Sequence, residues 1–171
     1  MYLISDGGLS CNTLDTIESV LLTKNSNILD GIKLDVRKTI DNKYVLSRYD
    51  DLSILTCSKM IVSKSKYEYL KKVKFPSHIF KYYIPTLLEI LNKYNQDKII
   101  VIELYNNNLD ELYKILENYD YKYYFYSKDT NILNELYNKD FNKLGRILSN
   151  NDIYDVRVNN NLYKNAFLIK K

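Results

Sequence analysis

The sequence has no tryptophan, one histidine and two cysteines among its 171 residues. The two cysteines, Cys11 and Cys57, are too few for a disulfide framework, and their spacing matches no metal-binding motif. We therefore expect reduced thiols, which are typical of cytoplasmic proteins. The absence of tryptophan goes with an abundance of Tyr, Asn and Lys, a bias that indicates an AT-rich genome and no particular function.

Long apolar runs are also missing. No stretch approaches the ~20 residues of a membrane-spanning helix, and the strand-like Tyr2-Leu3-Ile4 follows Met1 almost directly. The sequence therefore predicts neither a signal peptide nor a membrane span, and we expect a cytoplasmic protein. The net charge of +4 is small, and the lysines are scattered in short runs such as Lys71-Lys72, so we expect no nucleic-acid partner.

The length suits one domain with a substantial core, residues 1–171, and no repeat or linker divides it. Apolar alternation, continuous apolar runs and turn residues predict six strands, at 2–5, 31–36, 43–47, 98–104, 121–126 and 144–148. Helices are expected after Asn12, around Tyr67–Val73, from Ile84-Pro85-Thr86, through Leu109, Leu112 and Leu116, and from Asp129 to Asn138. The segment 152–171 has room for one more strand or turn and a short helix.

Strands and helices alternate through most of the chain, which favours parallel βα units in a doubly wound sheet or a (β/α) barrel. A closed barrel of eight strands usually takes ~250 residues, with a lower limit near ~200. The chain is therefore short for closure, and about six to seven strands fit into an α/β sheet of either kind. An open sheet edge of this kind could pair with a second copy of the chain.

Charged residues at alternate positions of the strand 31–36 need a reason. Lys33 and Asp35 share one face, so that face either meets water or lines a polar site at the end of the strand. In parallel α/β folds the chemistry lies at the carboxyl ends of the strands. The residues at those ends are Ser5-Asp6-Gly7, Lys33-x-Asp35, Ser47-Arg48-Tyr49-Asp50, Glu103-x-Tyr105 and Tyr126-Ser127.

Taken in order over roughly residues 2–148, these motifs resemble the glycerophosphodiester phosphodiesterases, a family of TIM barrels. That family opens with a strand, His-Arg-Gly, and then Glu-Asn-Thr at the start of a helix. Its second strand carries Glu-x-Asp, two metal ligands, and its third strand leads to His-Asp-x-x-Leu and a later Thr. The matching segments here are Ser5-Asp6-Gly7, Cys11-Asn12-Thr13, Lys33-Leu34-Asp35, Arg48-Tyr49-Asp50-Asp51-Leu52 and Thr56.

Two further motifs of the family follow in the same order. Its Pro-Thr-Leu-x-Glu helix is represented by Pro85-Thr86-Leu87-Leu88-Glu89, and its Ile-Glu-x-Lys strand by Ile102-Glu103-Leu104-Tyr105. For a chain of this length, the resemblance implies an α/β fold of the TIM-barrel type, incomplete or open, with about six to seven strands. It also implies a phosphoric diester hydrolase of glycerophospholipid metabolism, with Ca²⁺ or Mg²⁺ as the metal if the chain is active.

The differences from the family fall on the chemistry. The two histidines that act as general acid and base are replaced by Ser5 and Arg48, which cannot exchange protons near neutral pH. Asp6 replaces the arginine that follows the first histidine. The only histidine, His78, matches neither position, and we interpret it as a structural or surface residue. Arg48 and Tyr105 remain as substrate-binding candidates.

The metal site is changed as well. Asp35 and Glu103 are retained, but Lys33 replaces the third ligand. Ca²⁺ and Mg²⁺ require oxygen ligands, and two carboxylates with an ammonium do not provide them. We expect Lys33 to lie within ion-pair reach of Asp35 or Glu103, to balance their charge, and no cofactor to be needed.

Three functions remain open from the sequence. The first is a non-catalytic pseudoenzyme that binds a phosphodiester or glycerophosphate ligand, or a protein partner. The alternative is an active metal-dependent phosphodiesterase with a rebuilt site, in which Asp6, Asp35, Glu103 and Asp50 surround the metal. The third is a gene remnant with a structural role or none.

Overall fold

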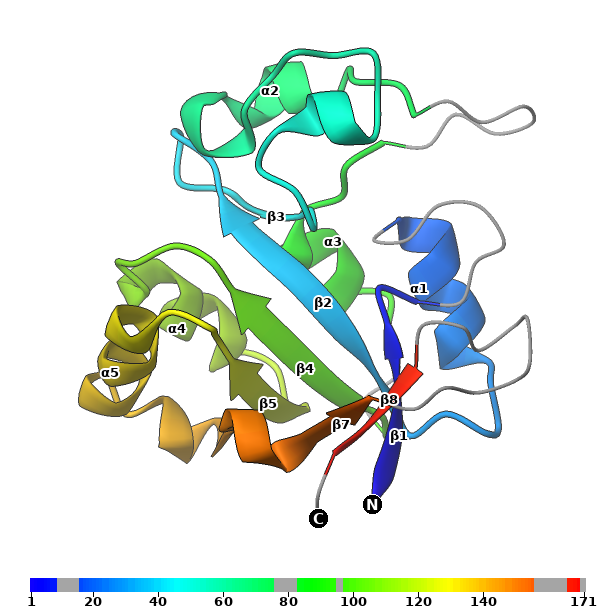
Figure 1. Ribbon diagram of the computed structural model, residues 1–171, viewed down its shortest axis with the longest axis vertical. Helices are drawn as coiled ribbons and strands as arrows, with labels where there is room; N and C mark the ends of the chain where they lie inside the picture. Colours follow the sequence, from blue (N-terminus) through cyan, green and yellow to red (C-terminus); the bar gives the residue numbers. More distant parts are fainter. Residues whose placement is uncertain (9–15, 76–82, 95–96, 156–165, 170–171) are drawn as a thin grey trace.

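The computed structural model describes residues 1–8, 16–75, 83–94, 97–155 and 166–169. Its centre is a sheet in which five strands run parallel (Figure 1). In spatial order they are β6 (Gly145–Ile147), β5 (Lys122–Tyr126), β4 (Ile99–Leu104), β2 (Gly31–Lys38) and β1 (Tyr2–Asp6). Each lies within two residues of its predicted bounds.

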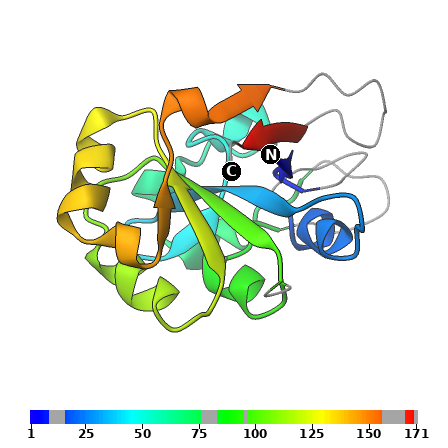
Figure 2. The same cartoon turned by 90° about the horizontal axis from the view of Figure 1, so that it is seen from below.

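The helices lie outside this sheet, as expected for βα units (Figure 2). They are α1 (Ile17–Lys24), α2 (Tyr67–Leu70), α3 (Leu87–Leu91), α4 (Asp110–Leu116) and α5 (Thr130–Asn138). The predicted capping box at α3 is present, because Thr86 accepts from the Glu89 backbone and the Glu89 carboxylate accepts from the Thr86 backbone. Helix α1 is capped by Thr16; the predicted cap, Asn12, lies outside the described residues.

Strand alternation divides the sheet into two faces. The outer face packs against the helices through aliphatic and aromatic side chains such as Ile32, Leu34, Ile102 and Phe125. Strands β2 and β4 approach so closely that a Cβ on Gly31 would lie 2.3 Å from the Ile99 carbonyl oxygen. Both strands are buried along nearly their whole length, which explains their apolar character.

Strand β3 (Tyr44–Leu46) pairs antiparallel with the carboxyl end of β2. Residues 50–75 then form a small lobe above this end of the sheet, containing α2 and two short 3₁₀ helices, η1 (Leu52–Ile54) and η2 (Val62–Lys64) (Figure 1). The lobe has its own core of Val45, Leu52, Val62, Leu70 and Ile84. Its position places it at the same end of the sheet as the predicted site.

Two further strands follow the 3₁₀ helices η3 (Phe141–Lys143) and η4 (Asn150–Asp152). Strands β7 (Ile153–Asp155) and β8 (Ala166–Ile169) pair antiparallel with each other, and β8 pairs antiparallel with β1. The sequence predicted one more strand or turn here, and the described part of this segment contains two strands. The short helix also expected within 152–171 is not present in the described residues of that segment.

The hairpin of β7 and β8 lies on the side of the sheet opposite α3 and α4 (Figure 2). A second, smaller core forms there from Ile4, Val101, Tyr124, Leu148 and Ile169. The described sheet stays open, because its path ends at β6 on one side and β7 on the other. The incomplete (β/α) barrel predicted from the sequence is therefore confirmed. In the described part of the chain, none of the helices is long and apolar enough to cross a membrane.

Candidate functional site

The strand register gathers four charged side chains on the inner face, at the carboxyl end of the sheet. Asp6 on β1 lies beside Lys33 on β2, and Asp35 on β2 lies beside Glu103 on β4. Lys33 and Asp35 are two residues apart and share a face. The polar face of this strand therefore lines a site and does not meet bulk water: Lys33 is 9% exposed and Asp35 is fully buried.

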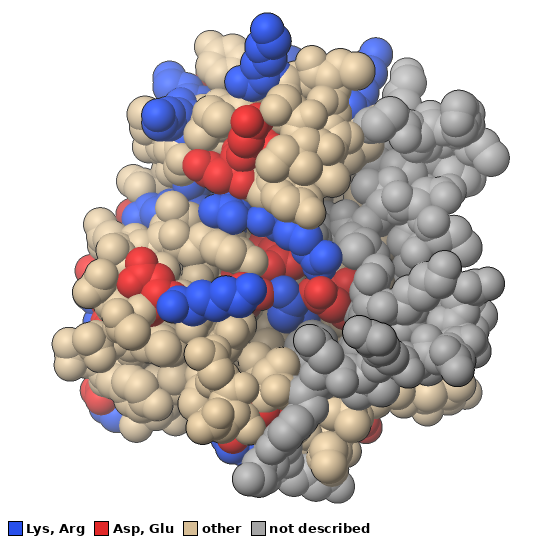
Figure 3. Space-filling model, in the orientation of Figure 1, with Lys and Arg blue, Asp and Glu red and all other residues tan. Residues whose placement is uncertain are grey.

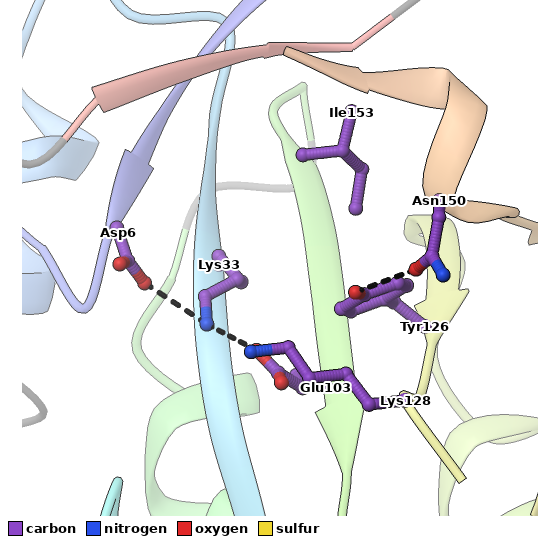
Figure 4. A pocket seen from close by; sticks show the side chains of 7 residues that line it. All are labelled: Asp6, Lys33, Glu103, Tyr126, Lys128, Asn150 and Ile153. Atoms are coloured by element: carbon purple, nitrogen blue, oxygen red, sulfur yellow. Dashed lines mark hydrogen bonds and ion pairs between the residues drawn. The ribbon is translucent and has the colours of Figure 1, made fainter. Parts of the chain in front are cut away.

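Lys33 forms the centre of this cluster (Figure 4). Its Nζ lies 3.0 Å from Asp35 Oδ1 and 3.1 Å from Asp6 Oδ1. It also donates a short hydrogen bond to Glu103 Oε2. The predicted ion pairing of Lys33 is thus present, and it extends to Asp6, which the sequence had not placed in the pair.

A second cation, Arg48, enters from the chain that follows β3. Its Nη2 lies 2.8 Å from Asp6 Oδ1 and 3.3 Å from Asp35 Oδ2. The hydroxyl of Tyr105 donates to Asp35 Oδ1 over 2.5 Å. The Arg37 guanidinium lies 4.0 Å from the Tyr105 ring centre and donates to the Arg48 carbonyl, so it holds both residues in place.

The pKa values in the cluster are set by two opposing effects, burial of the charged groups and their pairing with opposite charges. Burial alone would raise the pKa of the Asp35 carboxyl, but Lys33, Arg48 and the Tyr105 hydroxyl outweigh it and the pKa is lowered. Burial alone would lower the pKa of Lys33, but the carboxylates of Asp35, Asp6 and Glu103 raise it above its ordinary value. Asp6 is different: burial outweighs the two cations and raises its pKa. Asp35 and Lys33 are therefore held charged at neutral pH.

A pocket of about 330 Å³ opens beside the cluster. The strand ends form one wall, and η4 with β7 forms the other through Asn150 and Ile153 (Figure 4). The Tyr126 hydroxyl donates to Asn150 Oδ1 over 2.9 Å. Lys128 also lines the pocket, is exposed, and has no ion-pair partner among the described residues. Acidic and basic side chains alternate across this middle part of the face in Figure 3.

Comparison with known proteins gives no matching family model and no matching curated protein. Solved structures do match. They include glycerophosphodiester phosphodiesterases from Thermotoga maritima (26% identity, TM-score 0.67, 78% of this chain and 57% of that chain) and Agrobacterium tumefaciens (16%, 0.72, 82% and 64%). An Oleispira antarctica phosphodiesterase in complex with the product sn-glycerol-3-phosphate also matches (22%, 0.68, 78% and 60%). The chain has the fold of the glycerophosphodiester phosphodiesterases. It spans less than two thirds of each of these three structures.

The resemblance read from residues 2–148 is thereby confirmed at the level of the fold. The positions that carry the histidines of glycerophosphodiester phosphodiesterases can now be located. Ser5 is buried, and strand alternation turns it to the face opposite Asp6. Arg48 lies in the cluster as an ion-paired cation. His78 lies outside the described residues.

The donor set does not fit the divalent metal of a glycerophosphodiester phosphodiesterase. An ammonium, which can only donate, stands at the third ligand position and lies against Asp35 and Glu103, the two carboxylates at the other ligand positions. Asp50, expected among the ligands of a rebuilt site, instead accepts from the Ser63 backbone and hydroxyl, both at 2.8 Å. Among the described residues, no group of three or more His, Cys, Asp or Glu side chains is placed to hold a metal ion.

Sequence reasoning missed part of the site. Lys128 comes two residues after the aromatic strand, and its place at a strand end was a usable signal. Asn150 and Ile153 gave no such signal, because they reach the pocket through a C-terminal turn and hairpin without a periodic pattern.

Proposed function

We propose that the chain is a non-hydrolytic protein with the fold of a glycerophosphodiester phosphodiesterase, and that its pocket binds a small ligand of the glycerophosphate class. The observation that carries the proposal is the Lys33 ammonium, which lies between three carboxylates on the inner face. Hydrolysis by the family mechanism needs Asp35 and Glu103 free for a metal, a third ligand where Lys33 stands, and two groups that exchange protons. Neither Ser5 nor Arg48 can act as a general acid or a general base near neutral pH.

Ligand binding requires much less of the site. The pocket volume is at the lower end of the range for small-molecule sites, which suits a ligand of a few heavy atoms. Lys128 offers an ammonium to a phosphoryl group, and Tyr126 and Asn150 offer hydrogen bonds to hydroxyls. The Oleispira antarctica phosphodiesterase binds sn-glycerol-3-phosphate, which supports this class of ligand for a pocket in the same fold.

One observation favours the alternative, an active phosphodiesterase with a rebuilt site. Asp6 lines the pocket, and burial raises the pKa of its carboxyl above the ordinary value. A carboxyl with a raised pKa can act as a general acid. Asp6 is nevertheless held by both Lys33 and Arg48, so proton transfer would disrupt two ion pairs.

Two assays test the proposal. Glycerophosphocholine should not be hydrolysed above background with Ca²⁺, Mg²⁺ or Mn²⁺, because positioned acid and base groups each contribute ~10²–10⁴ in rate. Calorimetry should detect binding of sn-glycerol-3-phosphate, weakened at least tenfold in Lys128→Ala and unchanged in Lys114→Ala, an exposed lysine on α4. Turnover that is lost in a folded Asp6→Asn variant would establish the alternative. Equal binding by both lysine variants would show that the pocket is not the ligand site.

A further inference from the structure

The net positive charge of the chain is concentrated in one short segment. Residues 59–74 contain six lysines and one glutamate, a net charge of +5, whereas all 171 residues carry +4. The remaining residues therefore sum to −1. The six lysines are all exposed and lie on the lobe: Lys59, Lys64, Lys66, Lys71, Lys72 and Lys74. Figure 3 shows basic side chains projecting from this upper end of the molecule.

Exposed apolar side chains lie in and beside the same lobe. Ile54 is 59% exposed, Leu55 36% and Tyr69 52%. Ile40, 62% exposed, lies beside the lobe at Ser65, whose backbone carbonyl accepts from the Ile40 N–H. Single exposed apolar residues need no explanation, but several among lysines define a surface of mixed apolar and cationic character.

One of these apolar side chains, Tyr69, lines an open hollow of about 400 Å³ together with Met60, Lys72 and Lys74. The Lys72 ammonium lies 5.9 Å from the Tyr69 ring centre, so an aromatic and a cationic group lie side by side on this part of the lobe.

The lobe is fixed to the sheet. Tyr67 anchors it from two sides, because its backbone N–H donates to Asp41 and its hydroxyl donates to Glu89. The Asp50 carboxylate, two residues after Arg48, accepts hydrogen bonds from the backbone N–H and the hydroxyl of Ser63. The lobe is thus held in a defined position relative to the pocket, at the carboxyl end of the sheet.

We propose that this lobe is a docking surface for an anionic lipid bilayer, independently of the function proposed above. Lysines near a membrane surface are attracted by anionic headgroups, and aliphatic and aromatic side chains partition into the interface. A polyanion such as nucleic acid, or an acidic protein, would use the lysines but leave Ile54 and Leu55 exposed to water. Docking through the lobe turns the end of the sheet that carries the pocket toward the lipid surface.

Vesicle co-sedimentation of the whole chain tests the proposal. Binding is expected with vesicles of phosphatidylcholine containing 30% phosphatidylserine, and not with phosphatidylcholine alone. Each lysine near the surface contributes about 1 kcal/mol, or roughly fivefold in partitioning. Lys72→Gln with Lys74→Gln should therefore weaken binding about 25-fold at low salt. The matched control, Lys93→Gln with Lys114→Gln, removes the same charge from the helical side and should bind like the wild type.

A second variant separates lipid from other polyanions. Leu55→Ser changes no charge and should weaken vesicle binding at least about fivefold, because its methyl groups leave the interface. Circular dichroism confirms that each variant is folded. The proposal is overturned if anionic vesicles are not bound, if the control pair loses as much as the lobe pair, or if Leu55→Ser binds vesicles like the wild type. Tighter binding to double-stranded DNA than to vesicles would overturn it in favour of a nucleic-acid partner.

Discussion

Replacing Lys33 by alanine removes the cation at the centre of the cluster. The ammonium contacts three carboxylates, of which Asp35 and Glu103 have side chains 0% and 5% exposed. Removing one partner of a buried ion pair typically costs about 3–5 kcal/mol, because it leaves a charge in a poorly solvating environment. Arg48 stays beside Asp35 and Asp6, so we expect a loss at the lower end, about 3 kcal/mol. For a domain of this length that corresponds to a fall in melting temperature of ~6–12 °C.

The loss of stability in Lys33→Ala should depend on pH in a characteristic way. In the wild type the pKa of Asp35 is lowered, so its stabilisation is present above the ordinary value of 3.8 and is lost as the pH falls through the folded pKa. Without Lys33, the effect of burial on Asp35 is opposed only by Arg48 and the Tyr105 hydroxyl, so the pKa of that carboxyl should be higher than in the wild type. The destabilisation of Lys33→Ala should therefore shrink between pH 7 and pH 5, as Asp35 takes up a proton, while the wild type stays level.

Urea unfolding followed by circular dichroism at pH 7 and pH 5 measures both effects. Lys33→Met keeps most of the apolar stem and should lose nearly as much stability as Lys33→Ala, which assigns the effect to the charge. Lys139→Ala breaks an exposed ion pair with Asp110 and should leave the midpoint unchanged. The reasoning is refuted if Lys33→Met unfolds like the wild type at pH 7, or if the loss in Lys33→Ala is equal at both pH values.

Three further changes test neighbouring features. Lys33→Glu places a fourth carboxylate in the cluster, so Ca²⁺ should raise the melting temperature of this variant and leave that of the wild type unchanged; a variant indifferent to Ca²⁺ would contradict this. Tyr105→Phe removes a donor to Asp35 and raises the pKa of that carboxyl, so acid unfolding should move to higher pH in a circular dichroism titration. Gly31→Ala should lower stability by about 1–3 kcal/mol in urea unfolding, because its Cβ would meet the Ile99 carbonyl; an unchanged midpoint would show that the strands can separate.

Most of the fold could be predicted because its signals are local. The apolar run Ile99–Leu104, with Glu103 as its one charged residue, and the capping box of Thr86 and Glu89 determine element type without knowledge of the rest of the chain. The C-terminal hairpin could not be predicted in the same way. Strand β8 is placed by pairing with β1, more than 150 residues earlier, and no local pattern specifies such a partner.

The site was predictable to the extent that it follows strand alternation. Lys33 and Asp35 had to share a face, and the ordered motifs placed Glu103 at the end of another strand, which the structure pairs with β2. Asp6 was expected as a replaced arginine, or as a metal ligand in a rebuilt site. Its role as the carboxylate shared by Lys33 and Arg48 depends on the register of β1 against β2, which the sequence does not reveal. The opposite wall of the pocket, with Asn150 and Ile153, depends on tertiary packing alone.

The burial of the cluster and its internal charge pairing are physically connected. Asp35 and Glu103 are 0% and 4% exposed on the inner face, and Asp35 is surrounded by Lys33, Arg48 and Tyr105. Two buried carboxylates need a countercharge from the moment the chain folds. A metal provides that charge only when it is bound, whereas a lysine on the same strand provides it as soon as the strand is in place. The proposed non-hydrolytic function therefore assigns these carboxylates a structural role, in which they pair with Lys33 and stabilise the inner face.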